Sequence, residues 1–297
     1  MNKAARATLA KETINHLVPS VLSSNPRAQE GVQNSQLFRG RTDLPKLISN
    51  DHGQTQLETT SAAASNPPLP VRLVQSDTLD AARELHFQHP KARIAVLNMA
   101  SPLQPGGGVL RGAKAQEESL CMRSTLYPSL RPEWYRHPHD AVIYTPDVLV
   151  FRSAEMKMLE AKDRFYVDVI SCAAPRHPEV SGGKDGSTSV CYADAEDEEM
   201  MSLKVKFIMR AAAKMGVTHL ILGALGCGAY RNPIGQVANI MRKCLVGKGS
   251  GSRPAEEDWR GAGIEQVVFA ILDDSPAKVV WRAFVDELKD YALVAAE

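Results

Sequence analysis

Beyond residue 70, short apolar runs alternate with segments of helical spacing, and this alternation constrains the fold more than any other feature. Turn residues bound each run, which is typical of buried strands. The expected strands are 71–74, 94–97, 142–144, 148–151, 165–170, 219–222 and 267–272, and the expected helices are 80–87, 120–126, 200–215 and 234–245. Strands that alternate with helices predict a three-layer α/β/α domain with a mixed, mostly parallel sheet.

The first 69 residues have a different character. Within residues 4–22, Leu9, Thr13, His16 and Leu17 lie near helical spacing and the pattern stops at Pro19, so a single leading amphipathic helix is expected. From residue 25 to 70 the periodicity is lost among polar residues and prolines, which predicts a wrapping segment. We therefore expect a partly helical N-terminal extension over 1–69 and one α/β domain over 70–297. Surface loops are expected at 181–189 and 247–263.

Composition excludes several classes of partner and cofactor. Thirty-five basic and 34 acidic side chains leave a net charge of +1, which gives no general attraction for duplex nucleic acid or an anionic membrane. The five cysteines are widely spaced without a Cys-x-x-Cys pair, so neither a metal site nor a disulfide framework is expected. We expect an intracellular, reduced protein of the nucleus or cytoplasm, because Glu12 counts against a mitochondrial presequence and no secretory signal is apparent. The uncharged stretch 217–230 is too short to span a bilayer.

In open α/β sheets, ligands bind beyond the carboxyl ends of the strands. The expected strand 94–97 is followed by Asn98 and then by a loop with three consecutive glycines, Gly106–Gly108. Glycines permit positive φ and let a ligand approach the backbone N–H groups, which suits a phosphate or pyrophosphate. The alternative interpretation is a flexible surface loop.

Two adjacent carboxylates, Glu117 and Glu118, follow the glycines just before the helical segment 120–126. Their simplest role is to favour the positive end of the helix dipole. If the glycines hold a phosphate, however, the carboxylates lie beside bound sugar, where one can act as general acid while the other holds hydroxyl groups. Like charges in one pocket would also raise one pKa toward the value that a general acid needs.

The strand 219–222 is followed by a loop of small residues, 223–233, and a helix. A strand, a loop and a helix N-terminus provide free N–H groups for an anion, although such turns are common in α/β proteins. Cys227 raises the alternative of a thiolate nucleophile, since helix N-termini lower thiol pKa values. Tyr230 is either an aromatic contact for a ligand or ordinary core packing.

The glycine triplet, seven intervening residues and Gln116-Glu117-Glu118 resemble the defining motif of microbial-type poly(ADP-ribose) glycohydrolases, a branch of the macrodomain fold. The resemblance extends to 96–101, 119–127, 77–82, 168–170 and 269–273. The loop after strand 219–222 resembles the second phosphate loop of macrodomains. Leu225 and Arg231 depart from the tryptophan and glycine expected there.

The resemblance implies hydrolysis of ribose–ribose O-glycosidic bonds in poly(ADP-ribose), mainly from the chain end, without cofactor or metal. Glu118 would be the general acid and then the base, and Glu117 would hold ribose hydroxyls. The implied ADP-ribose ligands are Asn98, Pro105, Gly106, Gly107, Gly108, Val109, Gln116, Gly226, Cys227, Gly228, Ala229 and Tyr230. ADP-ribosylated proteins would be the partners, and the process would be the DNA damage response.

Three alternatives remain at this stage. The same pocket can bind ADP-ribose without cleaving it, although two carboxylates near an anionic ligand give a pure reader no advantage. A mono-ADP-ribosyl hydrolase would differ only in the leaving group. A scaffold with a degenerate site is disfavoured by the intact Asn98, Gly106–Gly108 and Glu118.

Overall fold

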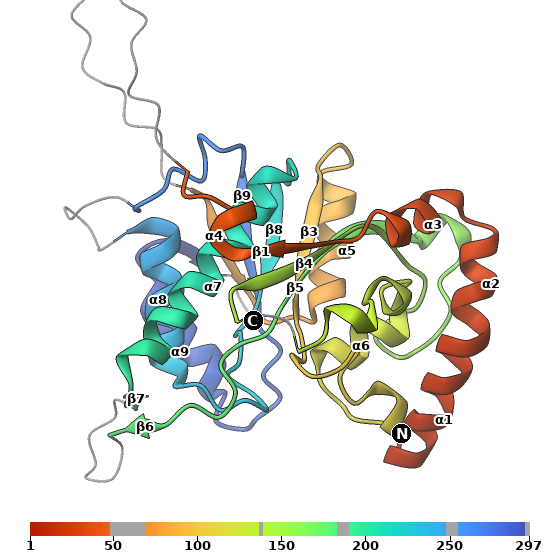
Figure 1. Cartoon of the computed structure of the whole chain (residues 1–297), viewed down its shortest axis with the longest axis horizontal. Helices are drawn as coiled ribbons and strands as arrows, with labels where there is room; N and C mark the ends of the chain where they lie inside the picture. Colours follow the sequence, from red (N-terminus) through yellow and green to blue (C-terminus); the bar gives the residue numbers. More distant parts are fainter. Residues whose placement is uncertain (48–68, 137–138, 183–189, 248–254, 295–297) are drawn as a thin grey trace, which may run out of the picture.

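An eight-stranded mixed sheet forms the centre of the computed structural model (Figure 1). The structure describes residues 1–47, 69–136, 139–182, 190–247 and 255–294. The sheet has the order β1 (Gln36–Arg39), β4 (Ala141–Val150), β5 (Phe165–Cys172), β3 (Ile94–Met99), β8 (His219–Leu222), β9 (Gln266–Ala270), β2 (Val71–Val74) and β10 (Ala292–Val294). The pairings from β5 to β10 are parallel, whereas β4 is antiparallel to both β5 and β1.

Helices cover both faces of this sheet. The helices on one face are α7 (Ala195–Lys214), α8 (Ile234–Val246) and α9 (Val279–Leu288), and those on the other are α5 (Thr78–Gln88) and α6 (Gln116–Arg123) (Figure 1). Single 3-10 turns lie at Val109–Arg111, Tyr127–Ser129, Pro132–Trp134 and Ala161–Asp163. The expected three-layer macrodomain-like α/β/α fold with a mixed, mostly parallel sheet is therefore confirmed.

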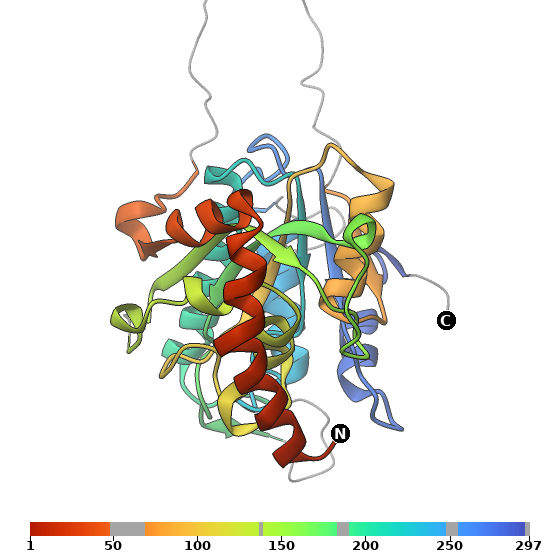
Figure 2. The same ribbon diagram turned by 90° about the vertical axis from the view of Figure 1, so that its right-hand side faces the viewer.

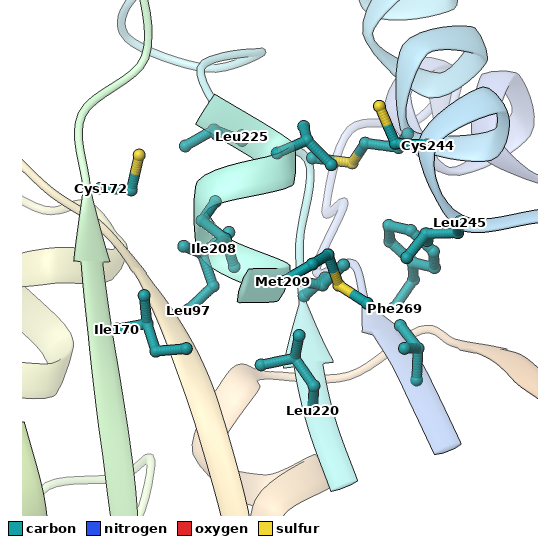
Figure 3. Close-up of a cluster of buried hydrophobic side chains, with 14 of the residues drawn as sticks. Leu97, Ile170, Cys172, Ile208, Met209, Leu220, Leu225, Cys244, Leu245 and Phe269 are labelled. Carbon is teal, nitrogen blue, oxygen red and sulfur yellow. The ribbon is translucent and has the colours of Figure 1, made fainter. Parts of the chain in front are cut away.

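The central strand β3 is buried on both faces because it contributes to two hydrophobic clusters. Ala95 and Leu97 pack with α7 and α8, whereas Ile94 and Val96 pack with α5 and α6. Figure 3 shows the first cluster, in which Leu97 and Leu220 from the sheet face Met209 of α7. Such continuous apolar strands are typical of parallel sheets covered on both sides. This packing fixes the carboxyl ends of β3, β5 and β8, where the site lies.

A long N-terminal helix packs beside α6 (Figure 2). It consists of α1 (Lys3–Glu12), a π-helical turn (Thr13–Leu17) and α2 (Val18–Ser23). The prediction that the helix ends at Pro19 is wrong. The π-turn hydrogen-bonds Val18 N–H to Thr13 O, five residues back, so that Pro19 enters the first turn of α2, where its missing N–H is tolerated.

Regular elements also occupy part of the segment that was expected only to wrap the domain. These are α3 (Pro26–Gln33), β1 and α4 (Gly40–Asp43). β1 pairs with β4 and so belongs to the main sheet. Residues 48–68 of that segment lie outside the described part of the chain. The division at residue 70 stays a prediction.

The expected strands 142–144 and 148–151 are one strand, β4, with a register shift between Thr145 and Val148. Asp147 has a φ of +52°, and its N–H donates to the buried Asp168 carboxylate at 2.9 Å. The bulge therefore interrupts the alternation of side chains between the two faces of the sheet without ending the strand. Of the expected surface loops, 183–189 and 248–254 lie outside the described residues, while Val180–Ser181 (β6) pairs with Cys191–Tyr192 (β7).

Candidate active site

Three neighbouring strands place the first group of site residues. Asn98 lies near the end of β3, opposite Ser171 of β5 in the parallel register. The Asn98 Nδ2 donates to Ser171 Oγ at 3.0 Å, and both side chains are buried. Because β8 flanks β3 on its other side, the loop that follows β8 opens at the same edge. Asn98 therefore lies between the two loops that the sequence singles out.

Two of the three glycines have a backbone that other residues rarely adopt. Gly106 and Gly107 have φ values of +64° and +56°. A Cβ on Gly107 would lie 2.8 Å from Glu118 Oε1 and 2.9 Å from Glu117 Oε2, which is closer than real Cβ contacts. Glycine at position 107 thus lets the loop pass directly over both carboxylates.

The two carboxylates belong to the first turn of α6, and each is bound by a different part of the loop. Glu117 Oε2 accepts from the Ser101 N–H at 2.7 Å, whereas Glu118 Oε1 accepts from the Gly108 N–H at 2.8 Å. Both side chains are buried, with 3% and 7% of their surfaces exposed. The adjacent acids are therefore fixed separately, one by each end of the loop.

Burial, with a contribution from the charge of Glu118, raises the pKa of Glu117 from 4.5 to about 8. The Ser101 N–H, the Asn98 side chain and the Gly106 backbone act in the opposite direction, because they favour the carboxylate. Glu117 is consequently mostly protonated at neutral pH. Like-charge repulsion in the pocket thus contributes to a raised pKa at Glu117.

Two buried oxygens at this site lack a hydrogen-bond partner among the described residues, Asn98 Oδ1 and Glu117 Oε1. Both come from residues whose remaining polar atoms bind Ser171 and Ser101. An unsatisfied buried polar atom costs about 1–3 kcal/mol, so such atoms in a native fold call for an explanation. A ligand with hydroxyl groups would satisfy both atoms, because a hydroxyl can donate to Asn98 Oδ1 and accept from a protonated Glu117.

Gln116 was expected to contact the ligand, but its side chain binds the protein. Its Oε1 accepts from the Met99 N–H at 2.9 Å, and its Nε2 donates to Leu97 O at 2.6 Å and to Thr78 Oγ1 at 3.3 Å. These bonds join the start of α6 to the end of β3. Gln116 thereby fixes Asn98 relative to the two carboxylates.

The loop after β8 is closed on itself by a residue that the sequence analysis missed. Asn232 is buried, donates to Pro175 O at 2.8 Å and Gly226 O at 3.1 Å, and accepts from the Tyr192 hydroxyl at 2.8 Å. Gly226 has a φ of +75°, and a Cβ there would lie 2.5 Å from Asn232. The Asn-Pro pair before α8 was the available signal, because asparagine often bonds nearby backbone.

This second loop presents free backbone donors next to open space. The N–H groups of Gly228, Ala229 and Tyr230 donate to no backbone carbonyl within the described residues. A Cβ on Gly228 would meet nothing within 4 Å. Three consecutive N–H groups at the entrance to α8 form a typical anion-binding arrangement.

Tyr230 connects the two loops. Burial raises its pKa, a hydrogen bond with the Ser101 side chain lowers it, and the nearby charge of Glu117 raises it again. The Tyr230 carbonyl accepts from the His177 N–H at 3.0 Å. Ser101, which also donates to Glu117, was not among the predicted site residues. The structure thus brings the expected Tyr230 against the glycine loop and the carboxylates.

The surroundings of Cys227 decide the alternative raised for it, and those of Leu225 and Arg231 bear on the two departures from the expected pattern. Burial raises the pKa of the Cys227 thiol to about 12, so it is not a thiolate nucleophile. Leu225 is fully buried in the core shown in Figure 3. Arg231 has a φ of +56°, which explains why glycine suits that position.

Within the described ranges, no cluster of three His, Cys, Asp or Glu side chains is arranged to hold a metal ion. No helix in the described ranges is long and apolar enough to cross a membrane.

Comparison with known proteins identifies the motif. Residues 21–153 match the model of the microbial-type PARG catalytic domain, where PARG denotes poly(ADP-ribose) glycohydrolase. Over these residues the chain is similar to microbial-type PARG. No curated protein sequence matches it.

Solved PARG structures extend the likeness over nearly the whole chain. PARG from Thermomonospora curvata is 28% identical with a TM-score of 0.72, over 96% of this chain and 99% of that one. The same enzyme bound to the inhibitor ADP-HPD is 26% identical with a TM-score of 0.70, over 95% and 99%. PARG from Deinococcus radiodurans in complex with ADP-ribose is 29% identical with a TM-score of 0.68, over 90% and 99%.

Proposed function

We propose that this protein is a poly(ADP-ribose) glycohydrolase that hydrolyses ribose–ribose O-glycosidic bonds and releases ADP-ribose. The PARG family and the solved PARG structures with ADP-ribose or ADP-HPD support this activity. ADP-ribosylated proteins are then its partners, because they carry the polymer.

One observation carries the proposal. Two buried carboxyl groups lie under a glycine loop, and two buried oxygens there, Asn98 Oδ1 and Glu117 Oε1, lack a hydrogen-bond partner among the described residues. A ribose has vicinal hydroxyl groups at short spacing, and each of them can donate or accept. Its anomeric carbon would then lie beside Glu118, the second carboxylate.

The reaction needs one proton, and the pair supplies it. Burial keeps a proton on Glu117 at neutral pH, beside Glu118, because both carboxyl groups lie against Gly107; transfer of this proton to Glu118 would give the acid form that reacts. In the first step, Glu118 gives a proton to the departing ribose oxygen, the C1–O bond breaks with its electron pair going to that oxygen, and an oxocarbenium ion forms. In the second step, the Glu118 carboxylate takes a proton from water as the hydroxide adds to C1. Hydrolysis is complete, and Glu118 is protonated again.

The two loops would stabilise the charges. The backbone N–H groups of Gly228, Ala229 and Tyr230 would bind the pyrophosphate, since they donate to no backbone carbonyl among the described residues. In the first loop, the N–H groups of Gly107, Gly108 and Val109 already donate to Gln104 O, Glu118 Oε1 and Gly106 O, so this loop would line the site and hold Glu118. Preorganised N–H groups stabilise developing charge without reorganisation. Asn98 and Glu117 would hold the ribose hydroxyls, while the Tyr230 ring would pack against the sugar. Adjacent carboxylates cannot face each other across the bond, so the scheme uses one acid rather than the usual opposed pair.

Two further functions compete with this proposal. A reader of ADP-ribose would bind through the same loops, but it would gain nothing from burying Glu117 at the energetic cost that its raised pKa implies. A mono-ADP-ribosyl hydrolase would use the same acid on a different leaving group. We favour polymer cleavage, mainly from the chain end, because the PARG motif is present.

The test incubates the purified protein with radiolabelled poly(ADP-ribose) and, separately, with a mono-ADP-ribosylated protein. Products are resolved by thin-layer chromatography. The proposal expects ADP-ribose from the polymer and a stable mono-ADP-ribosylated protein. Binding of ADP-ribose without release from either substrate would establish the reader instead. Preferential release from the mono-modified protein would establish the mono-ADP-ribosyl hydrolase.

A further inference from the structure

The N-terminal helix α1 contacts the loop that carries the glycine triplet. The Arg6 Nε donates to the Gly112 carbonyl at 2.9 Å. Gly112 has a φ of +71°, and a Cβ there would lie 2.1 Å from Lys3 O and 2.9 Å from Ala7 N. The backbone of α1 therefore lies directly against residue 112, an approach that glycine alone permits.

From Gly112, hydrogen bonds continue into the site. The Gly112 N–H donates to Val109 O at 3.0 Å, and the Ala113 N–H donates to Gly108 O at 3.1 Å. The Gly108 N–H in turn donates to Glu118 Oε1 at 2.8 Å. An unbroken series of contacts thus joins Arg6 to the carboxylate of the proposed acid.

Apolar packing supports the same contact. Val109 is 1% exposed and belongs to the hydrophobic cluster that also contains Ala10 of α1. Figure 2 shows the N-terminal helix, in red, lying along one side of the domain. Burial therefore fixes Val109, the first residue of the 3-10 turn Val109–Arg111, and the Arg6 hydrogen bond fixes Gly112, directly after its last residue.

The same leading helix is also linked to the far end of α6. Arg152 Nη1 donates to Thr13 Oγ1 at 2.6 Å and to Met122 O, in the last turn of α6, at 3.2 Å. The Thr13 hydroxyl donates to Leu9 O at 2.7 Å at the start of the π-turn. π-turns within α-helices are frequent at functional sites. The helix thus holds the loop before α6 and, through Arg152, the end of α6.

We propose that residues 3–13 are a brace that fixes the glycine loop over Glu118, with Arg6 as its main positioning residue. Three consecutive glycines have large conformational freedom, so the loop needs an external contact to hold the Gly108 N–H on Glu118. The family-model match begins at residue 21, so the brace lies outside it. This inference rests on the proposed glycohydrolase function.

The test compares the full chain with Arg6→Ala, Arg6→Lys and Lys11→Ala. Lys11 is an exposed cation on the same helix, so its removal is a matched control for charge and helix propensity. The readouts are kcat and KM for release of ADP-ribose from poly(ADP-ribose), and amide hydrogen exchange in peptides that cover 106–113.

For Arg6→Ala, kcat should fall about tenfold to a hundredfold, as for a small misplacement of the catalytic group, while KM rises by no more than about threefold because the second loop still binds pyrophosphate. Amide hydrogen exchange at 106–113 should accelerate relative to the wild type, and by more than exchange in the rest of the chain. Arg6→Lys should recover most of the activity, since an ammonium can reach the same carbonyl. Lys11→Ala should match the wild type.

Gly112→Ala provides an independent variant, because its Cβ would push α1 away while Arg6 remains. We expect at least the effect of Arg6→Ala. If Arg6→Ala and Gly112→Ala keep the wild-type kcat, or lose activity only in proportion to a folded fraction measured by near-UV circular dichroism, the brace is refuted. A wild type that releases no ADP-ribose would instead refute the proposed function.

Discussion

Replacement of Glu117 by glutamine should change how stability depends on pH. Burial raises the pKa of Glu117 from 4.5 to about 8, so the folded protein keeps a proton that the unfolded chain releases between these values. Stability contributed by a protonated Glu117 is therefore present below pH 4.5 and is lost as the pH rises toward 8. The difference corresponds to roughly 5 kcal/mol as an upper bound, at about 1.36 kcal/mol per pH unit.

Glutamine resembles the protonated acid and does not titrate. The stability of Glu117→Gln relative to the wild type should thus increase by roughly 3–5 kcal/mol between pH 4.5 and 8. Urea unfolding at half-unit pH steps measures this difference, and Glu160→Gln, at an exposed carboxyl, is the control. If the curves of Glu117→Gln and wild type stay parallel within about 1 kcal/mol, Glu117 is ionised in the fold and the account of the pair is wrong.

Three other substitutions separate the roles of site and scaffold. Asn98→Ala should weaken ADP-ribose binding about fivefold to twentyfold by calorimetry, because it removes a buried acceptor for a ribose hydroxyl; unchanged affinity would contradict this role. Cys227→Ser should keep polymer cleavage within about twofold of wild type, since a thiol with a pKa of about 12 is no nucleophile; loss of turnover with intact binding would reopen that alternative. Arg210→Ala should lower the free energy of unfolding by about 3–5 kcal/mol, because it leaves the buried Glu257 unpaired, whereas Arg210→Met with Glu257→Leu should cost less; the reverse order would be inconsistent with a buried ion pair.

The layered fold could be predicted because buried parallel strands such as β3 are apolar throughout and flanked by turn residues. The short edge strand β1 could not, because it depends on pairing with β4, about a hundred residues away. The helix through Pro19 was missed for a related reason. A π-turn is stabilised by tertiary contacts, here the bond from Arg152 to Thr13, and leaves no local pattern.

In the candidate site, too, some residues could be predicted from the sequence and others could not. Motif residues such as Asn98, Glu117 and Glu118 were predicted, because their side-chain chemistry and spacing are visible in the sequence. The bonds that position them were not visible. Ser101 binds Glu117 through its backbone N–H, which any residue possesses, and Gln116 turned out to hold β3. Backbone donors, and side chains that bind the backbone of another element, depend on the three-dimensional arrangement of the chain. Their positions can therefore be recognised in the sequence only after the fold is known.

The central claim is that Glu118, bound by the Gly108 N–H, transfers the proton. The most direct test is single-turnover release of ADP-ribose from poly(ADP-ribose) by the wild type and Glu118→Gln, with polymer binding measured in parallel. We predict that the variant binds polymer like the wild type but releases ADP-ribose about a thousandfold more slowly, because general acid–base catalysis contributes 10²–10⁴-fold. Release within about tenfold of the wild-type rate would show that another group transfers the proton and would contradict the account.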